Sequence, residues 1–224
     1  MKIDWDNIPT INAKRVSLRP FNANDADAVY QIYANPEVMR YWGGSPMVDL
    51  HEANDFLAGA QEDLRRRQCI QWGIAHRPDN QIIGTIVFFR LDAFAHKAEI
   101  GFALGRHSWG MGYMHEALQA ALGYGFDELE FRRIEADVDP RNLRSLRLLE
   151  GVGFKNEGYL RERWFVAGKT QDSLFYGLLK KEWNCSGASY EVIVASRYAA
   201  TSVRARIVNS RLGHWTAVAL GLLH

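Results

Sequence analysis

Cysteine is scarce in this 224-residue chain, which has only Cys69 and Cys185. Neither belongs to a C-x-x-C pair, so the sequence favours neither a disulfide framework nor a cysteine metal cluster, and it suits a reducing compartment. His107 and His115 have no carboxylate or cysteine at ligand spacing. We therefore expect no metal and a cytoplasmic location.

The chain also lacks a large net charge and long apolar runs. Its 27 basic and 26 acidic side chains leave a formal charge of +1, which gives no reason to expect nucleic acid or an anionic membrane as a partner. No apolar run approaches the roughly 20 residues that a membrane helix needs. Residues 1–6 contain no apolar core of a signal peptide. We expect a soluble monomer or homodimer that binds neither nucleic acid nor membrane.

The hydrophobic pattern changes between strand and helix periods and indicates one α+β domain around one sheet. Residues 36–48 predict a loop rich in turn formers and aromatic rings. Ala167 and Gly168 are the expected turn between the last two strands. Strands are expected over residues 15–20, 70–76, 82–91, 98–104, 133–138, 154–165 and 170–180, and helices over about 24–34, 49–67, 112–127 and 142–151.

The composition changes near residue 184. From there to residue 224 the chain has four arginines and one acid, and no clean period. Its apolar end, residues 215–223, is far too short to span a bilayer. We divide the chain into an N-terminal extension (1–13), a domain (14–182) and an atypical tail (183–224) of unknown role. Three interpretations of the tail stay open: an added element, a flexible extension or a non-native reading of the chain.

A glycine loop follows the strand expected at residues 98–104 and opens a helix. A helix start leaves about four backbone N–H groups without partners and carries roughly half a positive charge. Gly110 and Gly112 let the chain bring these donors close to a pyrophosphate, since neither has a Cβ. A dinucleotide fingerprint is not supported, because His115 replaces its third glycine, and no Gly-Lys-Ser/Thr motif is present. The loop is therefore a phosphate cradle.

Two runs carry a family resemblance: AEIGFALGRHSWGMGYMHEAL, and NLRSLRLLEGVGF some thirty residues later. Together they resemble the GNAT superfamily of acyl-CoA-dependent N-acetyltransferases, in particular its RimJ/RimL-like branch of ribosomal-protein N-terminal acetyltransferases. The resemblance covers roughly residues 14–182. It implies a GNAT fold: a central mixed, mostly antiparallel sheet of six to seven strands, flanked by helices and splayed between the fourth and fifth strands.

The resemblance also implies acetyl-CoA as the cosubstrate. In the family, the loop's backbone amides hold the pyrophosphate, and free amides of the splayed strand bind pantetheine and the thioester carbonyl. His107 stands where the family has Gln or Arg, a departure of little weight where backbone amides bind the ligand. For the 3′-phosphate, Arg132, Arg133, Arg141, Arg144 and Arg147 are candidates, or they form a solvated face. The implied cofactor-binding residues are Phe102, Ala103, Leu104, His107, Trp109, Gly110, Met111, Gly112, Tyr113, Asn142, Ser145 and Arg147.

The implied reaction moves the acetyl group to a primary amine by direct attack on the thioester. By resemblance, Glu99 is the general base, and the alternative is a surface glutamate paired with Lys97 or an arginine. Leu149 occupies the position of the family's usual tyrosine acid. Ser145 is then the acid or the partner of the thiolate, or it only bonds within the helix start. Asn142 is an N-cap, a pantetheine contact, or both.

The acceptor stays open between a protein N-terminal α-amine and a small amine such as an amino acid, a polyamine or an antibiotic. Tyr41, Trp42 and Trp164 flank an acceptor groove if the loop after the first helix converges with the last hairpin. Otherwise these rings belong to ordinary packing. A non-catalytic acyl-CoA-binding regulatory protein of the same fold is the alternative function.

Overall fold

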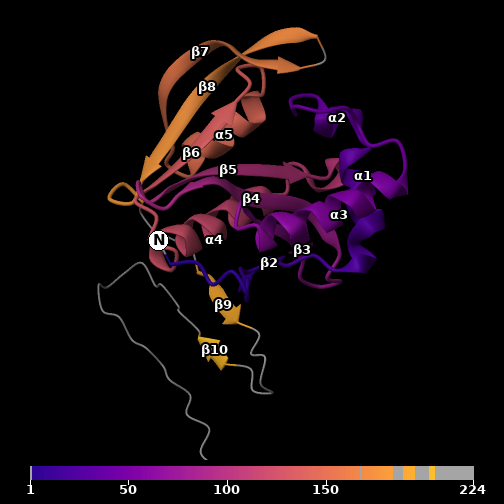
Figure 1. Cartoon of the computed structure of the whole chain (residues 1–224), viewed down its shortest axis with the longest axis vertical. Coiled ribbons are helices and arrows are strands. Elements are labelled where there is room, and N and C mark those ends of the chain that lie inside the picture. Colours follow the sequence, from indigo (N-terminus) through magenta and orange to yellow (C-terminus); the bar gives the residue numbers. More distant parts are fainter. Residues whose placement is uncertain (1, 167, 184–188, 195–201, 205–224) are drawn as a thin grey trace, which may run out of the picture.

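The computed structural model describes residues 2–166, 168–183 and 189–194, and the backbone of 202–204. These residues form one sheet of ten strands in the order β10-β9-β1-β2-β3-β4-β5-β6-β8-β7 (Figure 1). The strands are β1 (Thr10–Asn12), β2 (Val16–Arg19), β3 (Ile70–His76), β4 (Ile82–Asp92), β5 (Lys97–Leu104), β6 (Arg133–Val138), β7 (Lys155–Val166), β8 (Lys169–Leu179), β9 (Glu191–Val194) and β10 (Ser202–Arg204).

The expected α+β architecture is confirmed, and the seven expected strands correspond to β2 through β8. The segment from residue 36 differs from expectation, because it begins with a short helix instead of a loop. Asn35 caps this helix and Pro36 supplies its first residue, where a missing N–H is harmless. The helices are η1 (Ala23–Asp25), α1 (Ala26–Tyr33), α2 (Pro36–Met39), α3 (Leu50–Arg65), η2 (Arg106–Ser108), α4 (Tyr113–Asp127) and α5 (Leu143–Gly151).

One junction in the sheet is parallel and incomplete. β5 and β6 pair only through residues 97–99 and 133–135, although both strands continue further. Beyond that point β5 stays paired with β4, and β6 with β8. Figure 1 shows β6, β7 and β8 rising away from β5. β5 and β6 are the fourth and fifth expected strands, so the predicted splay is confirmed.

Two buried clusters lie on opposite faces of the sheet. In the larger one, α4 and α5 pack against one face, around a fully buried Trp72 whose ring meets Phe88 and Tyr124 edge-on. In the smaller one, α1, α2 and α3 cover residues of the other face such as Ala75 and Ala103. Alternate residues of a strand point to opposite faces. The three strands β3, β4 and β5 therefore contribute to both clusters.

Part of the atypical tail joins the fold. β9 pairs with β1 in an antiparallel ladder. Tyr190 is 4% exposed, and its hydroxyl donates to Asp127 Oδ2 at 3.0 Å. Its ring lies against Gly123 of α4, where an added Cβ would come within 2.4 Å of it. The expected turn residue Ala167, the second cysteine Cys185 and the apolar end 215–223 lie outside the described residues.

Candidate active site

The chain passes from β5 into α4 through η2 and two left-handed glycines. Gly110 and Gly112 have φ angles of +78° and +79°, a conformation in which a side chain is strained. Gly112 is the N-cap of α4. The first N–H groups of the helix have no partner within it and carry a partial positive charge. The predicted order of strand, glycine loop and helix is confirmed, and it forms a site suited to an anion.

Arg15, which precedes β2, ties this loop to the sheet. Its guanidinium donates to the carbonyl of Met111 (Nη1–O 2.9 Å) and to the carboxylate of Glu116 (Nε–Oε2 2.8 Å). The guanidinium also lies 4.9 Å from the ring centroid of Tyr113. The loop and the first turn of α4 are therefore held by one side chain. No local sequence pattern marks Arg15, because its partners lie about a hundred residues away.

The free edge of β5 follows from its pairing with β4. The N–H of Gly105 donates to the carbonyl of Ile83 at 2.8 Å. Hydrogen bonding alternates along an antiparallel strand. Phe102 and Leu104 therefore direct their backbone groups away from β4, into the gap left by β6, whereas Ala103 directs its own toward β4. The splay thus exposes a row of backbone donors and acceptors.

Trp109 closes one end of this edge. Its indole Nε1 donates to the carbonyl of Leu104 at 2.7 Å. The guanidinium of Arg106 lies 4.9 Å from the ring centroid, and that of Arg144 lies 4.5 Å from it. Arg106 also pairs with Glu37 of α2 at 3.0 Å. Arg144 belongs to α5, which follows β6. Trp109 therefore connects the β5 side of the splay with the β6 side.

Glu99 occupies the last paired position before β5 and β6 separate. Its side chain is 6% exposed and accepts a hydrogen bond from Arg90 Nη1 at 2.7 Å. Burial raises the pKa of the Glu99 carboxyl above its ordinary value; the Arg90 guanidinium opposes this rise, and the carboxylates of Asp137 and Glu135 add to it. Lys97 pairs with Glu135 instead. The ion-pair partner of Glu99 is therefore an arginine, Arg90. The raised pKa of Glu99 also suits a general base that acts near neutral pH.

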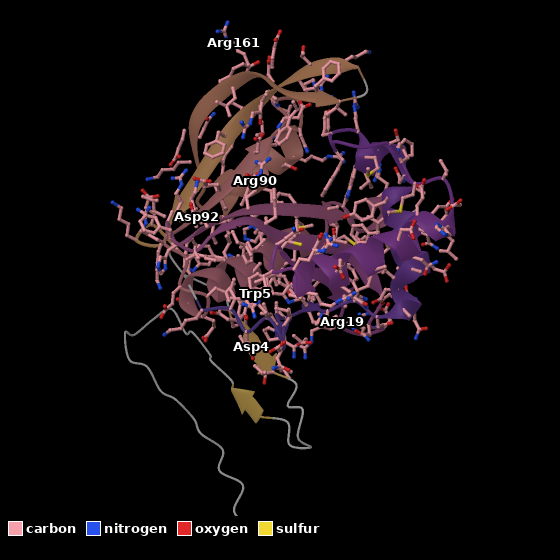
Figure 2. All side chains as sticks on the ribbon, in the orientation of Figure 1. Asp4, Trp5, Arg19, Arg90, Asp92 and Arg161 are labelled. Atoms are coloured by element: carbon pink, nitrogen blue, oxygen red, sulfur yellow. The ribbon has the colours of Figure 1, made fainter. Side chains whose placement is uncertain are left out.

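A second buried carboxylate, Asp137 of β6, lies on the same face of the sheet. It accepts hydrogen bonds from Trp164 Nε1 at 3.1 Å and from the hydroxyl of Ser173. The Trp164 ring centroid is 5.2 Å from the Arg90 guanidinium. Figure 2 shows Arg90 between β4 and the hairpin of β7 and β8. Asp137 therefore holds Trp164 beside the pair of Arg90 and Glu99, a role that no sequence motif indicated.

The three aromatic residues considered for the acceptor each contact a different neighbour. Trp42 packs edge-on against Tyr33 of α1, with ring centroids 5.8 Å apart, and lines a cavity. Tyr41 lies 5.9 Å from the guanidinium of Arg141, at the start of α5. Trp164 lies on β7, beside Arg90. The loop after the first helices therefore approaches the start of α5.

The start of α5 carries the other predicted residues. Asn142 is the N-cap, and its Oδ1 accepts a hydrogen bond from the N–H of Ser145 at 3.3 Å. Ser145 is partly buried, and Arg147 is exposed. Leu149 is fully buried in the larger core cluster, so this position packs and offers no proton. The capping role of Asn142 is present, and it leaves a ligand contact possible at the same residue.

The arginines considered for the 3′-phosphate have different surroundings. Arg133 pairs with Glu135 at 2.7 Å and also with Glu157. Arg141 pairs with Asp139. These two guanidinium groups are thus neutralised by carboxylates, while Arg144 stacks on Trp109 as described above.

A cavity of about 630 Å³ lies on the same face as Glu99. Its floor includes Val87 and Phe89 of β4, and Phe89 stands directly opposite Glu99 in β5. Directly opposed residues have Cβ atoms about 4.5–5.5 Å apart, so the cavity reaches the carboxylate end of the splay. The remaining lining residues are Tyr33, Met39, Trp42, Gly43, Gly44, Ser45, Met47, Phe56, Asp63, Gln68, Cys69, Gln71 and Thr85.

The described part of the chain has neither a metal-binding cluster nor a membrane-spanning helix. No group of three or more His, Cys, Asp and Glu side chains suited to a metal ion occurs there. None of its helices has the length and apolar character needed to cross a membrane. Cys69 is buried, and burial, with a smaller contribution from Asp63, raises the pKa of its thiol to about 11. That thiol is therefore protonated at neutral pH.

These residues fit coenzyme A. The left-handed glycines keep side chains away from the helix start, where the pyrophosphate would bind, and a Cβ on Gly112 would stand only 3.2 Å from Arg15 Nη2. The free edge of β5 offers backbone hydrogen-bond partners to the pantetheine arm of coenzyme A, which contains amide groups. A splayed sheet beside such a loop defines the class of acyl-CoA-dependent acyltransferases.

The comparisons with known proteins agree with this class. The family model of the acetyltransferase (GNAT) domain matches residues 15–155. The uncharacterized N-acetyltransferase p20 of Bacillus licheniformis is 35% identical over 174 residues, which are 78% of this chain and 98% of that protein. The chain therefore belongs to the GNAT acetyltransferase family and is an acyltransferase enzyme. The expected family, fold and enzyme class are confirmed.

Solved structures show the same likeness. A GNAT-family acetyltransferase from Bacillus anthracis has a TM-score of 0.70 and 28% identity, covering 77% of this chain and 99% of that one. Mycobacterium smegmatis RimJ in complex with CoA-disulfide has a TM-score of 0.67 and 25% identity, covering 79% and 88%. That neighbour binds a form of CoA, in agreement with the fit of the loop.

Proposed function

We propose that this enzyme transfers the acetyl group of acetyl-CoA to a primary amine, by direct attack of the amine on the thioester. The acceptor is a protein N-terminal α-amine or a small-molecule amine. One observation carries the proposal: Glu99 is a buried carboxylate with a raised pKa, placed where the sheet opens and beside a cavity. The likeness to RimJ supports a place in the RimJ/RimL-like branch.

The cofactor assignment follows the geometry of the loop and the strand edge. We assign the pyrophosphate to the backbone of residues 107–113, including His107, Trp109 and Met111. We assign pantetheine to the β5 edge at residues 102–104, where Phe102 and Leu104 offer backbone groups, and to Asn142 of α5. Arg147 is exposed at the same end of α5 and is assigned to the 3′-phosphate.

The chemistry requires a neutral amine, since an ammonium has no lone pair. An α-amine with a pKa near 8 is about nine-tenths protonated at pH 7, but removing its proton costs only about 1.4 kcal/mol, so one carboxylate acting directly or through a water is enough. Glu99 is the group that accepts this proton. Ser145 donates a hydrogen bond to the departing thiolate, whose pKa near 8.5 makes it a good leaving group. Acetyl-CoA supplies the activated acetyl group.

We also propose that residues 14–182 form the catalytic domain, and that the enzyme works in the cytoplasm as a monomer or homodimer. The pairing of β1 with β9 supports a structural role for parts of the flanking segments. Sedimentation velocity would distinguish the two oligomeric states.

The function is tested by release of CoA thiol from acetyl-CoA in the presence of a panel of peptides and small amines, with mass spectrometry of the products. We expect acetylated amine and stoichiometric thiol. If calorimetry detects acetyl-CoA binding while no member of a broad panel is acetylated, the enzyme assignment of this site is wrong, and the non-catalytic acyl-CoA-binding alternative is supported.

The pH dependence tests the role of Glu99. A base must be ionised to act, so the acidic limb of the profile of log kcat/KM against pH should lie above the ordinary range of a glutamate pKa. Arg90→Met removes the cation that favours the carboxylate, which raises the pKa of Glu99 further and should move this limb to higher pH. A limb that does not move in Arg90→Met would show that another group is the base.

A further inference from the structure

We infer that the cavity over β4 holds the body of the acceptor, and that the acceptor is a primary amine whose carbon frame is one apolar group, aromatic or branched aliphatic. This rests on the proposed function. The same chemistry has two sources: a free arylalkyl or alkyl amine, and the first residue of a peptide with a large apolar side chain. In the transfer, the N–C bond forms, the C–S bond breaks, the amine proton goes to Glu99, and the sulfur leaves as the CoA thiolate.

The wall of the cavity is aromatic and rich in thioethers. Tyr33, Trp42 and Phe56 form one ring cluster, in which Tyr33 lies 5.8 Å from Trp42 and 5.0 Å from Phe56 between centroids. Met39 of α2 and Met47 add two thioethers to the lining. Rings packed against each other hold their orientation, and methionines adapt to the ligand between them. Burial of an apolar ligand against such a surface is favourable by roughly 25 cal/mol per Å² of apolar area removed from water.

Two polar groups of the lining already have partners. The Tyr33 hydroxyl and Thr85 Oγ1 form a hydrogen bond of 2.6 Å, and both residues are buried. Burial raises the pKa of Tyr33 to about 12, so it carries no charge. The thiol of Cys69 lies 3.8 Å from Asp63 Oδ2 and is neutral as well. These groups are hydrogen-bonded to each other, which leaves Ser45, Gln68 and Gln71 as the other polar residues of a mainly apolar lining.

Charge excludes the main competing acceptor. Among the described lining residues, Asp63 is the one acidic side chain. A polyamine such as spermidine would bring more ammonium groups into this apolar cavity than Asp63 and the neighbouring Glu99 can balance. Unpaired buried charges are strongly unfavourable. A mono-amine leaves only the reacting nitrogen to be neutralised, and Glu99 does that.

The position of the cavity links it to the reaction. Phe89 and Val87 of its floor stand opposite Glu99 and Gly101 of β5. A Cβ on Gly101 would lie 3.2 Å from Val87 and 3.4 Å from Phe89, so glycine leaves the seam between the cavity and the splayed edge of β5 uncrowded. An amine whose body fills the cavity can therefore extend its nitrogen toward Glu99 and the edge of β5.

The test compares four acceptors with the full chain and acetyl-CoA: phenethylamine, a tripeptide amide that begins with phenylalanine, ethylamine and spermidine. We expect kcat/KM for phenethylamine or the phenylalanine peptide to exceed that for ethylamine by about 100-fold, because the apolar body is buried. The ratio between the first two acceptors distinguishes the free amine from the peptide source. A preference for spermidine, lost in Asp63→Asn, would overturn the inference and identify a polycation site.

Two variants test the wall directly. Trp42→Ala should raise KM for the preferred acceptor about tenfold and leave KM for acetyl-CoA unchanged. Its control is Phe94→Ala, since Phe94 is 99% exposed and lies outside the cavity. Gly44→Leu should narrow the cavity without disturbing the fold, because the nearest atom to its Cβ is Met39 Cε at 4.0 Å. Gly59→Leu, on exposed α3 with nothing within 4 Å, is the matched control. Unchanged acceptor kinetics in both cavity variants would contradict the inference.

The two proposals fail in different ways. If ethylamine and spermidine are acetylated as well as phenethylamine, the enzyme is an N-acetyltransferase, but the cavity does not select the acceptor. If no amine is acetylated, the proposed function fails, and calorimetry of phenethylamine with the wild type and Gly44→Leu still tests the cavity. Binding that weakens about tenfold in Gly44→Leu supports the cavity site, and equal binding overturns it.

Discussion

The loop between β5 and α4 offers its backbone to a ligand, whereas the cavity over β4 offers side chains. Residues 105–113 are contiguous, and the groups proposed to bind the ligand are backbone N–H groups, which every residue type except proline has. The cavity is assembled from α1, α2, α3, β3 and β4, each of which contributes a few side chains. The first region therefore tolerates changes of side chain as long as its φ angles are kept, while the second changes its specificity with each substitution.

Glu99→Gln should lower kcat/KM more than any other change, because it removes the proposed base. Glu99 itself is part of neither the loop nor the cavity lining. We expect kcat/KM at neutral pH to fall by about 10²–10⁴-fold, with the affinity for acetyl-CoA retained. Steady-state kinetics and calorimetry measure the two quantities. Glu157→Gln is the control, since its carboxylate binds Arg133 on β6. Equal loss in both variants would mean that Glu99 matters only for the charge cluster.

Gly112→Val should disrupt the loop between β5 and α4 and weaken its binding of acetyl-CoA. A β-branched residue at a φ of +79° is strained, and its Cβ would stand 3.2 Å from Arg15 Nη2. We expect the Kd for acetyl-CoA, measured by calorimetry, to rise about 100-fold. Gly168→Val provides the matched control, because Gly168 has a φ of +76° in the turn before β8 with nothing within 4 Å. A similar Kd in both variants and the wild type would refute the cradle.

Arg15→Met tests whether a side chain outside the loop contributes to acetyl-CoA binding, because Arg15 holds the loop and the first turn of α4 in place. Without the bonds to Met111 and Glu116 the loop is less ordered, and we expect the Kd for acetyl-CoA to rise about tenfold. The acceptor KM should not change. Arg77→Met is the control, because its guanidinium binds the carbonyl of Ala13 in the neighbouring turn without touching the loop.

Gly123→Ala should have the smallest effect, and it lies outside both regions. Alanine normally stabilises a helix interior by about 0.5–1 kcal/mol relative to glycine. Here its Cβ would come within 2.4 Å of the Tyr190 ring, so we expect a net loss of about 1–2 kcal/mol from overpacking. In a Tyr190→Ala background the same change should become stabilising. Denaturant unfolding measures both, and an unchanged sign would contradict the packing of Tyr190 on α4.

The two regions also differ in how well the sequence predicts them. The loop was found because strand, glycines and helix start are neighbours in the sequence, and the chemistry depends on backbone groups. Arg15 and Asp137 were not found, since their roles come from partners in other elements. Tyr41, Trp42 and Trp164 are grouped by residue type alone, and the neighbours that the structure gives them, Arg141, Tyr33 and Arg90, belong to other elements that no sequence pattern indicates. The strand positions were predictable, whereas the joining of β9 to β1 depends on a pairing across most of the chain.

The carboxylate of Glu116 also accepts hydrogen bonds from the backbone N–H groups of Arg15 and Val16, about a hundred residues before it. The start of α4 is therefore completed only when the N-terminal strand has joined the sheet, a contact of long sequence separation that forms slowly. Affinity for acetyl-CoA thus reports on the assembly of the whole domain. By mass action, acetyl-CoA at 100 times its Kd adds about 2.7 kcal/mol to the free energy of unfolding. Binding of the proposed cosubstrate would in this way support folding as well as catalysis, so removing acetyl-CoA should lower the free energy of unfolding of the enzyme as well as its rate.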